Sequence, residues 1–267
     1  SNRSLTSIII PNSVTSIGSE AFASCDSLVS ATIGDGVTSI GSYAFALCVN
    51  LTNIELGNSV TSIGSFAFSN CSNLVSTTIP DSVNSIGEGA FNYCTSLASI
   101  TIPDGVTSIG DATFFFCSDL TSIIIPNSVN SIGYAAFNYC ASLTNITIGD
   151  SVTSIGSSVF YDCTSLASAQ FDGSAPSIGS QVFYNTQVSY TVVGVTNAAS
   201  YGGDGATYAD LVVVDYSKIA SGQYLYTQSE YDAKLFIEEV QDLRAGSTMI
   251  EIENGQNQDK PLSVTVF

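Results

Sequence analysis

The chain has 267 residues and a formal net charge of -18 at pH 7, with five Lys and Arg, 23 Asp and Glu, and no His. Such an acidic chain repels polyanions, which excludes nucleic acid and anionic membrane surfaces as favoured partners. No apolar run approaches the roughly 18 residues of a membrane span, so we expect no membrane insertion. No cleavable signal precedes the first repeat, which we interpret as a mature or truncated chain.

One sequence unit repeats along about two thirds of the chain. At residues 97–119 it reads LASITIPDGVTSIGDATFFFCSD, and it returns every 23 residues without a change of phase. A constant period in this range predicts a solenoid, in which each coil buries its apolar side chains against its neighbours. The phenylalanine of each coil marks the period: Phe22, Phe45, Phe68, Phe91, Phe114, Phe137, Phe160 and Phe183.

Within one unit, the alternation Ile100-Thr101-Ile102 predicts a half-buried strand that pairs in parallel with the same strand of the next coil. Pro103-Asp104-Gly105 predicts a turn, and residues 106–109 (VTSI) a second extended piece. Residues 110–120 have apolar positions three apart, which predicts a single helical or 3₁₀ turn. The apolar side chains of each unit form its core.

The repeat resembles the BspA-like class of leucine-rich repeats, which occurs in bacterial and some protist surface proteins. The text SLTSIIIPNSVTSIGSEAFASC at residues 4–25, with copies at 97–117 and 120–140, is the basis of this resemblance, which extends over residues 4–185. It implies a curved solenoid, secreted or surface-anchored, that acts in adhesion or protein binding without catalytic residues. The predicted fold class is a β-rich (α/β-type) solenoid, a right-handed superhelix of about eight 23-residue coils with parallel strands, plus a small C-terminal α+β appendage.

Three domains are predicted. Residues 1–185 form the solenoid, and the eighth coil already departs from the repeat, since Thr186 replaces the cysteine. Residues 186–216, with predicted strands at 188–195 and 211–214, form a C-terminal cap. Residues 217–267 combine a predicted helix from about Thr227 to Gly246 with strands at 249–252 and 262–267. This last part is either a small packed appendage or an assembly or anchoring element.

All seven cysteines occupy the same position of the repeat, three residues after the phenylalanine. A free cysteine behaves as a small hydrophobic residue, so this pattern predicts a ladder of buried thiols. Disulfides between adjacent coils stay open as the alternative, given the strand spacing of about 4.8 Å. The cysteines are Cys25, Cys48, Cys71, Cys94, Cys117, Cys140 and Cys163.

No catalytic site is evident. The chain has no His, no G-x-S-x-G motif, and no basic side chain between residues 4 and 185 that would activate a serine. We therefore expect no enzyme activity, no cofactor and no metal centre. Asp81 and Asp104 are weak calcium candidates, because adjacent carboxylates with carbonyl oxygens approach the ligand number of calcium. They belong to a row of Asn and Asp that we otherwise interpret as turn residues.

The outward positions of the first strand of each coil are the candidate binding face. They are short, polar and nearly uncharged, and they have none of the aromatic or Arg anchors usual at binding hot spots. A solvated face without a ligand, and an ice-binding face, stay open beside a protein- or glycan-binding face. The candidate residues are Ser76, Thr78, Ser99, Thr101, Ser122, Ile124, Asn145 and Thr147.

The sequence is compatible with two functions. The leading hypothesis is a non-catalytic extracellular or cell-surface interaction and adhesion module that binds a protein or glycan through the strand face. The alternative is a structural subunit of an extracellular fibre, a homo-oligomer or polymer assembled head to tail by strand addition. The assembly strands would be those of Leu5, Ile8 and Ile10 at one end and of Leu262, Val264 and Val266 at the other.

Overall fold

The computed structural model describes residues 2–188 in full, and the backbone of strands at 190–193, 207–208, 211–215, 225–226, 250–252 and 262–266. The chain divides into two compact units, Ser1–Val188 and Ser189–Phe267. The further division at residue 216 stays a prediction.

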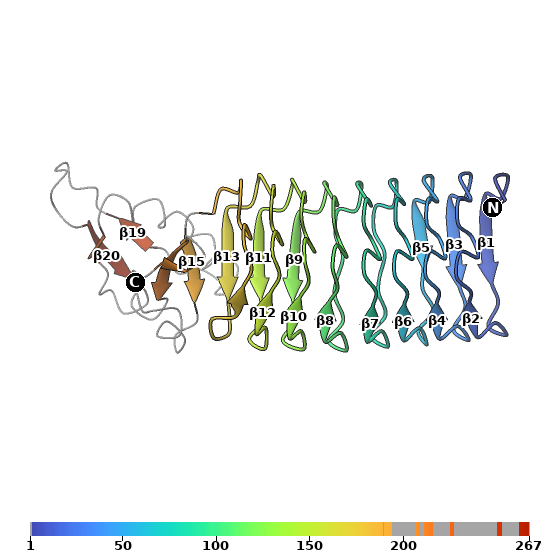
Figure 1. The fold of residues 1–267 in the computed structure, drawn as a ribbon, viewed down its shortest axis with the longest axis horizontal. Helices are drawn as coiled ribbons and strands as arrows, with labels where there is room; N and C mark the ends of the chain where they lie inside the picture. The colour runs from blue at the N-terminus through green and yellow to red at the C-terminus, as the bar shows by residue number, and fades with distance from the viewer. Residues whose placement is uncertain are drawn as a thin grey trace. The chain divides into compact units, whose positions relative to one another are not determined.

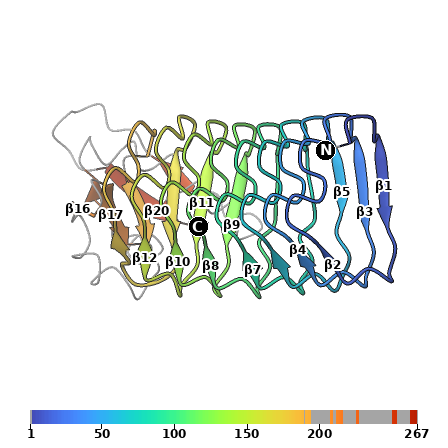
Figure 2. The ribbon, with the colours of Figure 1, turned by 45° about the vertical axis from the view of Figure 1, so that its right-hand side comes forward.

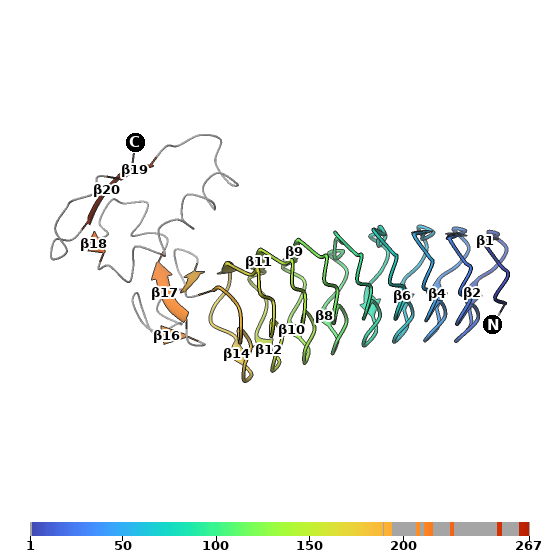
Figure 3. The same ribbon diagram turned by 90° about the horizontal axis from the view of Figure 1, so that it is seen from above.

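The first unit is a solenoid of eight coils, which we number 1 to 8 by their phenylalanines from Phe22 to Phe183 (Figure 1). Each coil contributes one strand to a back row, and most contribute one to a front row; the two rows lie along opposite sides of the unit (Figures 2 and 3). The front strands are β1 (Ser7–Ile10), β3 (Ser30–Ile33), β5 (Asn53–Glu55), β9 (Ser122–Ile125), β11 (Asn145–Ile148) and β13 (Ser168–Phe171). The back strands are β2 (Ser16–Ile17), β4 (Ser39–Ile40), β6 (Ser62–Ile63), β7 (Ser85–Ile86), β8 (Ser108–Ile109), β10 (Ser131–Ile132), β12 (Ser154–Ile155) and β14 (Ser177–Ile178).

The strands pair in parallel, and the pairing advances by one repeat from coil to coil. Ser7 of β1 lies opposite Ser30 of β3, and Ile17 of β2 lies opposite Ile40 of β4. Because the register equals the sequence period, every repeat position forms a straight row along the unit. The predicted solenoid of parallel strands is confirmed.

The predicted helical turn is wrong: residues 2–188 contain no helix. In coil 2 the amides of Ala44 and Ala46 bond to carbonyls three residues back, whereas those of Tyr43, Phe45 and Leu47 bond to coil 3. A helix would need all of these donors for itself. Tyr43 and Leu47 have φ values of 55° and 61°, so left-handed residues interrupt the segment. We call this part of each coil the turn segment.

The core of the solenoid is a stack of phenylalanines. From Phe22 to Phe183, successive rings are 5.0 to 5.6 Å apart and inclined by 6 to 19°. The six rings from Phe45 to Phe160 are fully buried. Each ring face is covered by the neighbouring rings, so the stacking that the period predicts is confirmed.

Prolines interrupt the front row. After β3 the amide of Gly34 donates to the carbonyl of Ile10 over 2.9 Å, which extends the pairing of β3 with β1. Pro80, Pro103 and Pro126 occupy the same position in coils 4, 5 and 6 and have no amide hydrogen. Between coils 3 and 6 the front row is accordingly reduced to single bridges, namely Asn53 with Ser76, Ser76 with Ser99, and Ser99 with Ser122.

The back row is interrupted once, between coils 4 and 5. The back strands form two sheets, β2-β4-β6-β7 and β14-β12-β10-β8, so β7 and β8 are not paired. A Cβ added at Gly110 would lie 3.3 Å from the amide nitrogen of Glu88, whereas one at Gly64 would lie 2.6 Å from that of Ser42. The coils are therefore further apart here. We call this interface the seam.

The described part of the second unit consists of short strands: β15 (Tyr190–Val193), β16 (Thr207–Tyr208), β17 (Leu211–Asp215), β18 (Leu225–Tyr226), β19 (Ile250–Ile252) and β20 (Leu262–Val266). β15 and β17 are parallel, and β16 pairs antiparallel with β17. β20 lies between β18 and β19, antiparallel to both. The strands predicted at 188–195, 211–214, 249–252 and 262–267 are confirmed, whereas the predicted helix from 227 to 246 lies outside the described residues.

Candidate interaction surfaces

The predicted binding face forms two rows on the front side. Ser122 and Ile124 of β9 lie opposite Asn145 and Thr147 of β11, and bridges connect Ser122 with the serines of coils 4 and 5. Ile124 is 71% exposed, and the others are exposed except Thr147, which is half-buried. The structure brings the eight predicted residues together, and their role in binding stays a prediction. They are Ser76, Thr78, Ser99, Thr101, Ser122, Ile124, Asn145 and Thr147.

The predicted assembly strands differ in how they are paired. β1, with Ile8 and Ile10, is the first strand of the sheet β1-β3-β5 and pairs on one side only; Leu5 just before it is half-buried. β20, with Leu262, Val264 and Val266, is the central strand of its sheet. Both edges of β20 are therefore already occupied.

A row of aromatic side chains follows the turn segments of coils 4 to 8, and it was not predicted. Tyr93, Tyr139 and Tyr184 are 40%, 38% and 54% exposed, and the others are half-buried. Successive rings are in contact, with centroids 4.8 to 6.2 Å apart. We call this row the aromatic stripe: Tyr93, Phe115, Phe116, Tyr139, Tyr161 and Tyr184.

Backbone conformation explains why these rings lie outside the core. Tyr93, Phe116 and Tyr139 come two residues after the core phenylalanine of their coils and have φ values of 56° to 60°. Such left-handed residues re-aim the chain, and the core position is already taken by the preceding phenylalanine. The stripe has the same 23-residue period as the core, since 93, 116 and 139 differ by 23. That period was the signal from which it could have been predicted.

One carboxylate belongs to the stripe. Asp162 accepts hydrogen bonds from the phenol of Tyr139 and from the amide of Asn185. The bond to Asp162 is the main cause that raises the pKa of the Tyr139 phenol above its usual value. The pKa of Tyr161 is also raised, first by desolvation and then by Asp162. The phenols therefore stay protonated donors at neutral pH.

The thiol ladder is confirmed, because all seven cysteines are free and buried. Each thiol from Cys48 to Cys163 donates to the carbonyl of the phenylalanine one coil earlier, over 3.1 to 3.3 Å. Burial raises the pKa of Cys48 and Cys94 from 9.0 to about 12, and raises that of Cys71, Cys117 and Cys140 as well. These thiols join coils and are not nucleophiles.

The row of Asn and Asp at the front turn makes bonds between coils. The side-chain oxygens of Asn12 and Asp35 accept from the amides one coil later, over 2.9 and 2.8 Å. Asp81 and Asp104, the calcium candidates, are exposed on adjacent coils. Within the residues that the structure describes, no three His, Cys, Asp or Glu side chains gather as a metal site would require. Calcium binding at this pair stays a prediction.

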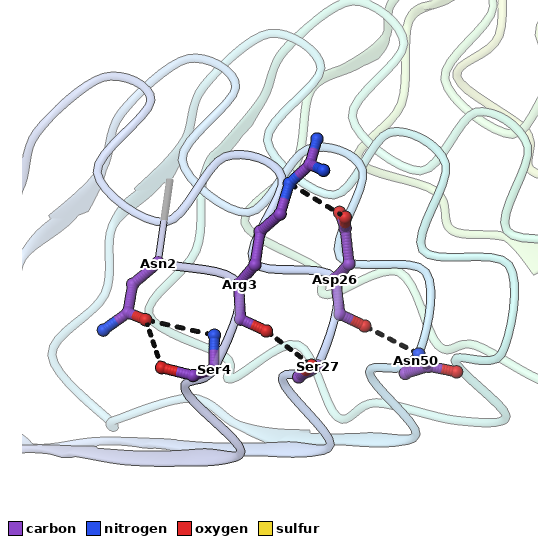
Figure 4. Close-up of polar contacts among 6 residues, drawn as sticks. All are labelled: Asn2, Arg3, Ser4, Asp26, Ser27 and Asn50. Atoms are coloured by element: carbon purple, nitrogen blue, oxygen red, sulfur yellow. Dashed lines mark hydrogen bonds and ion pairs between the residues drawn. The ribbon is translucent and has the colours of Figure 1, made fainter.

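Side chains also form hydrogen bonds from one coil to the next at the first two coils (Figure 4). The hydroxyl of Ser27 donates to the carbonyl of Arg3, and the amide of Asn50 donates to that of Asp26, each over 2.6 Å. Arg3 is 3.4 Å from Asp26, but its side chain is 76% exposed, so this ion pair adds little stability. Arg3 is the one basic side chain in residues 2–188.

An open groove of about 460 Å³ runs along the ends of β8, β10 and β12. It is lined by the Ser-Ile-Gly segments of three coils, with Asp111 and Tyr134. Tyr134 is 57% exposed, and its amide donates to the carboxylate of Asp111 over 2.7 Å. Asp111 is the one charged group of its lining, which otherwise offers only the hydroxyls of Ser108, Ser131, Ser154 and Tyr134, and no basic side chain lies among them to activate a hydroxyl.

Comparison with known proteins agrees with this geometry. The most informative solved structure is a leucine-rich repeat protein of T. pallidum, with a TM-score of 0.57 and 28% identity over 61% of this chain and 78% of that chain. A leucine-rich repeat protein of Bacteroides ovatus is 28% identical over 78% of this chain and 68% of its own, with a TM-score of 0.44. A leucine rich cell surface protein of Faecalibacterium prausnitzii is 25% identical, covering 86% and 81%, with a TM-score of 0.37.

No curated protein matches the chain. Among the described residues there is no helix with the length and apolar character that crossing a bilayer would require. The family model described as BspA type Leucine rich repeat region matches residues 1–111 and 84–201 with six copies, which together is most of the chain. Together with the 23-residue register and the buried phenylalanine and thiol ladders, this match shows that the chain belongs to the BspA-type leucine-rich repeat proteins.

Proposed function

We propose that the chain is a non-catalytic interaction module of an extracellular or cell-surface protein, and that it binds macromolecules through its exposed side chains. The proposal rests chiefly on the aromatic stripe. Tyr and other aromatic residues are the side chains most often found at binding hot spots, because they bury a large area at little entropic cost. Elsewhere in residues 2–188 the exposed surface is mostly Ser, Thr, Asn and Asp.

The construction of the solenoid supports this function. Its interior is filled by Phe, Ile, Leu, Val and Cys side chains, and its coils are bonded through the backbone in three rows. A rigid scaffold of this kind holds exposed residues in fixed positions without further ordering on binding. Leucine-rich repeat proteins are protein-interaction modules, and adhesion is the finer role that we propose here. The BspA-type family and the resemblance to surface proteins support the proposed location.

The experiment compares binding of the chain and of two variants to cell surfaces and to extracellular-matrix preparations, by flow cytometry and biolayer interferometry. Phe116→Asn with Tyr139→Asn removes the centre of the stripe, and Asn occupies the same repeat position in coils 3 and 8 as Asn70 and Asn185. Ile124→Thr removes one of the two exposed isoleucines of the front face, and Thr occupies that position in coils 2, 4, 5 and 7. We expect the stripe variant to lose binding and the front-face variant to retain most of it.

If the front-face variant loses binding and the stripe variant retains it, the binding face is the strand face that the sequence predicts. Binding unchanged in both variants would contradict the proposed function. Circular dichroism and urea unfolding must show that both variants are folded. If the double stripe variant does not fold, Phe115→Asn takes its place, because Asn92 and Asn138 already occupy that repeat position in coils 4 and 6.

A fibre subunit is the second candidate. It would use β1, which within the described residues pairs with β3 alone. Addition of β20 from another copy would require β20 to leave its place between β18 and β19. Light scattering against concentration tests this candidate, and a particle that stays monomeric contradicts it.

A further inference from the structure

We propose that the aromatic stripe binds a cationic, arginine-rich polypeptide segment of a partner protein. The inference rests on the proposed function and adds the chemistry of the partner. Three observations lead to it: the orientation of the rings, the distribution of charge, and the carboxylate within the stripe.

The rings of the stripe are less regularly oriented than those of the core. Tyr93 and Phe116 are inclined by 21°, and Tyr161 and Tyr184 by 16°, but the other neighbouring pairs are not parallel. Core phenylalanines lie within 19° of parallel, so their faces are covered by each other. In the stripe, Phe115 is inclined by 61° to Tyr93 and by 76° to Tyr139. Tyr139 is inclined by 59° to Tyr161. Pairs at such angles leave more of a ring face open than parallel stacking does, and a guanidinium group stacks on an open ring face.

The negative charge of the solenoid favours a positively charged ligand. Between residues 4 and 188 there are twelve Asp and Glu and no Lys, Arg or His. An acidic ligand, or the same face of a second copy, would be repelled. A basic segment would be attracted and steered toward this surface.

A carboxylate lies within the stripe, in coil 7. Asp162 belongs to the same row of repeat positions as Tyr93, Phe116 and Tyr139, and is half-buried. Its hydrogen bonds to Tyr139 and Asn185 fix its position but leave acceptor sites, because an ionised carboxylate accepts about four hydrogen bonds. An arginine that stacks on Tyr139 or Tyr161 would pair with it. Arginine, with its planar fork, is therefore preferred over lysine.

The variants separate the stripe from the general charge. Phe116→Asn with Tyr139→Asn alters the stripe and keeps the net charge of -18. Asp104→Asn removes one charge from an exposed turn outside the stripe, and Tyr134→Ser removes an exposed aromatic outside it, with Ser at that position in coils 1, 2 and 3. Asp162→Asn removes the carboxylate and keeps its shape. The residue at 162 has a φ of 56°, and Asn occurs at the same position of the repeat with similar values.

The assay is fluorescence anisotropy of the full chain with labelled nonapeptides of arginine, lysine or glutamate, at two salt concentrations. We expect the arginine peptide to bind more tightly than the lysine peptide and the glutamate peptide not to bind. The double stripe variant should lose at least about tenfold in affinity for the arginine peptide, given the usual strength of cation–π contacts. Asp162→Asn should lower the affinity more than Asp104→Asn, and Tyr134→Ser should leave it unchanged.

Bulk charge would explain the binding if Asp162→Asn and Asp104→Asn lowered the affinity for the arginine and lysine peptides equally and the double stripe variant had no effect. That result would overturn the proposal. Neutral oligosaccharides and self-association are tested in parallel, by calorimetry with dextran and cellulose oligomers and by sedimentation. If the stripe variant weakens one of these and not the arginine peptide, the cationic partner is wrong and the proposed function stands. If it weakens nothing, the stripe is not a binding surface and this inference fails, whereas the proposed function then depends on the result for the front-face variant.

Discussion

The thiol of Cys94 donates a hydrogen bond to the carbonyl of Phe68, one coil earlier, with 3.2 Å between Sγ and O. The same carbonyl also accepts the amide of Cys71 within its own coil. The cysteine thus has two roles: it fills a small apolar site, and it bonds one coil to the one before. A valine or alanine at this position would have only the first role.

Replacing Cys94 by alanine should lower the free energy of unfolding by about 1–3 kcal/mol, because the change removes this bond and leaves a small void. Urea unfolding followed by circular dichroism measures the loss. Asp104→Asn, a change in an exposed turn, is the control and should shift the midpoint little. A neutral Cys94→Ala would mean that the thiol fills space and adds nothing else.

The thiols also predict how stability depends on pH. Burial raises the pKa of Cys94 from 9.0 in the unfolded chain to about 12. Because the folded pKa is the higher one, the stabilisation is complete below pH 9 and is lost as the pH rises toward 12. Each buried thiol should remove up to about 1.4 kcal/mol per pH unit in that range. Urea midpoints measured from pH 7 to 11 test this, and a flat profile above pH 9 would contradict it.

Thiol titration gives an independent check. In the folded chain a chromogenic disulfide reagent should react slowly, since the thiolate is the nucleophile. In denaturant it should find all seven thiols.

Phe91 tests the core stack. Truncation to alanine should cost about 3–5 kcal/mol, since the ring is fully buried between Phe68 and Phe114. Phe22→Ala is the matched control at the end of the stack, where the ring is half-buried and has one neighbour. Its loss should be clearly smaller. Equal losses at both positions would show that the coils unfold without regard to stacking.

Gly89 and Ala112 test the left-handed positions of the turn segment. Gly89 has a φ of 58°, and an added Cβ would clash with the ring of Phe66. Gly89→Ala should therefore destabilise the chain by about 1–3 kcal/mol. Ala112 occupies the same position one coil later with a φ of 50°. Ala112→Gly should be neutral or stabilising, as measured by thermal unfolding, and a destabilising Ala112→Gly would contradict strain at this position.

The sequence is sufficient for the coil, the register and the core, because a fixed period leaves each residue only one possible row. It misleads at the turn segment, since an apolar spacing of three fits both a 3₁₀ turn and a chain of β-turns. Only the bonds of Tyr43 and Phe45 to the next coil distinguish the two. The aromatic stripe lies outside the prediction because the alternating strand pattern indicates only one outward face, that of the front strands. Phe115 and Phe116 next to the core Phe114 were the signal.

The missing backbone hydrogen bonds of the front row could have been predicted from Pro80, Pro103 and Pro126, which have no amide hydrogen. The seam could not, because coils 4 and 5 follow the same repeat at the back strands as every other pair. Asn84-Ser85-Ile86-Gly87 and Thr107-Ser108-Ile109-Gly110 differ only at their first residue. The gap at Gly110 is a property of the stacked structure and of no local sequence.

The seam gives the solenoid a mechanical weak point. On the back side β7 and β8 are unpaired, and on the front side Pro103 removes a rung, so at this level the coils are joined mainly through their turn segments. Tension applied along the rod should first open it there, leaving two blocks of four intact coils. Under such a load we expect the solenoid to yield in two steps, first at the seam and then within the blocks, and to close at the seam when the load is released.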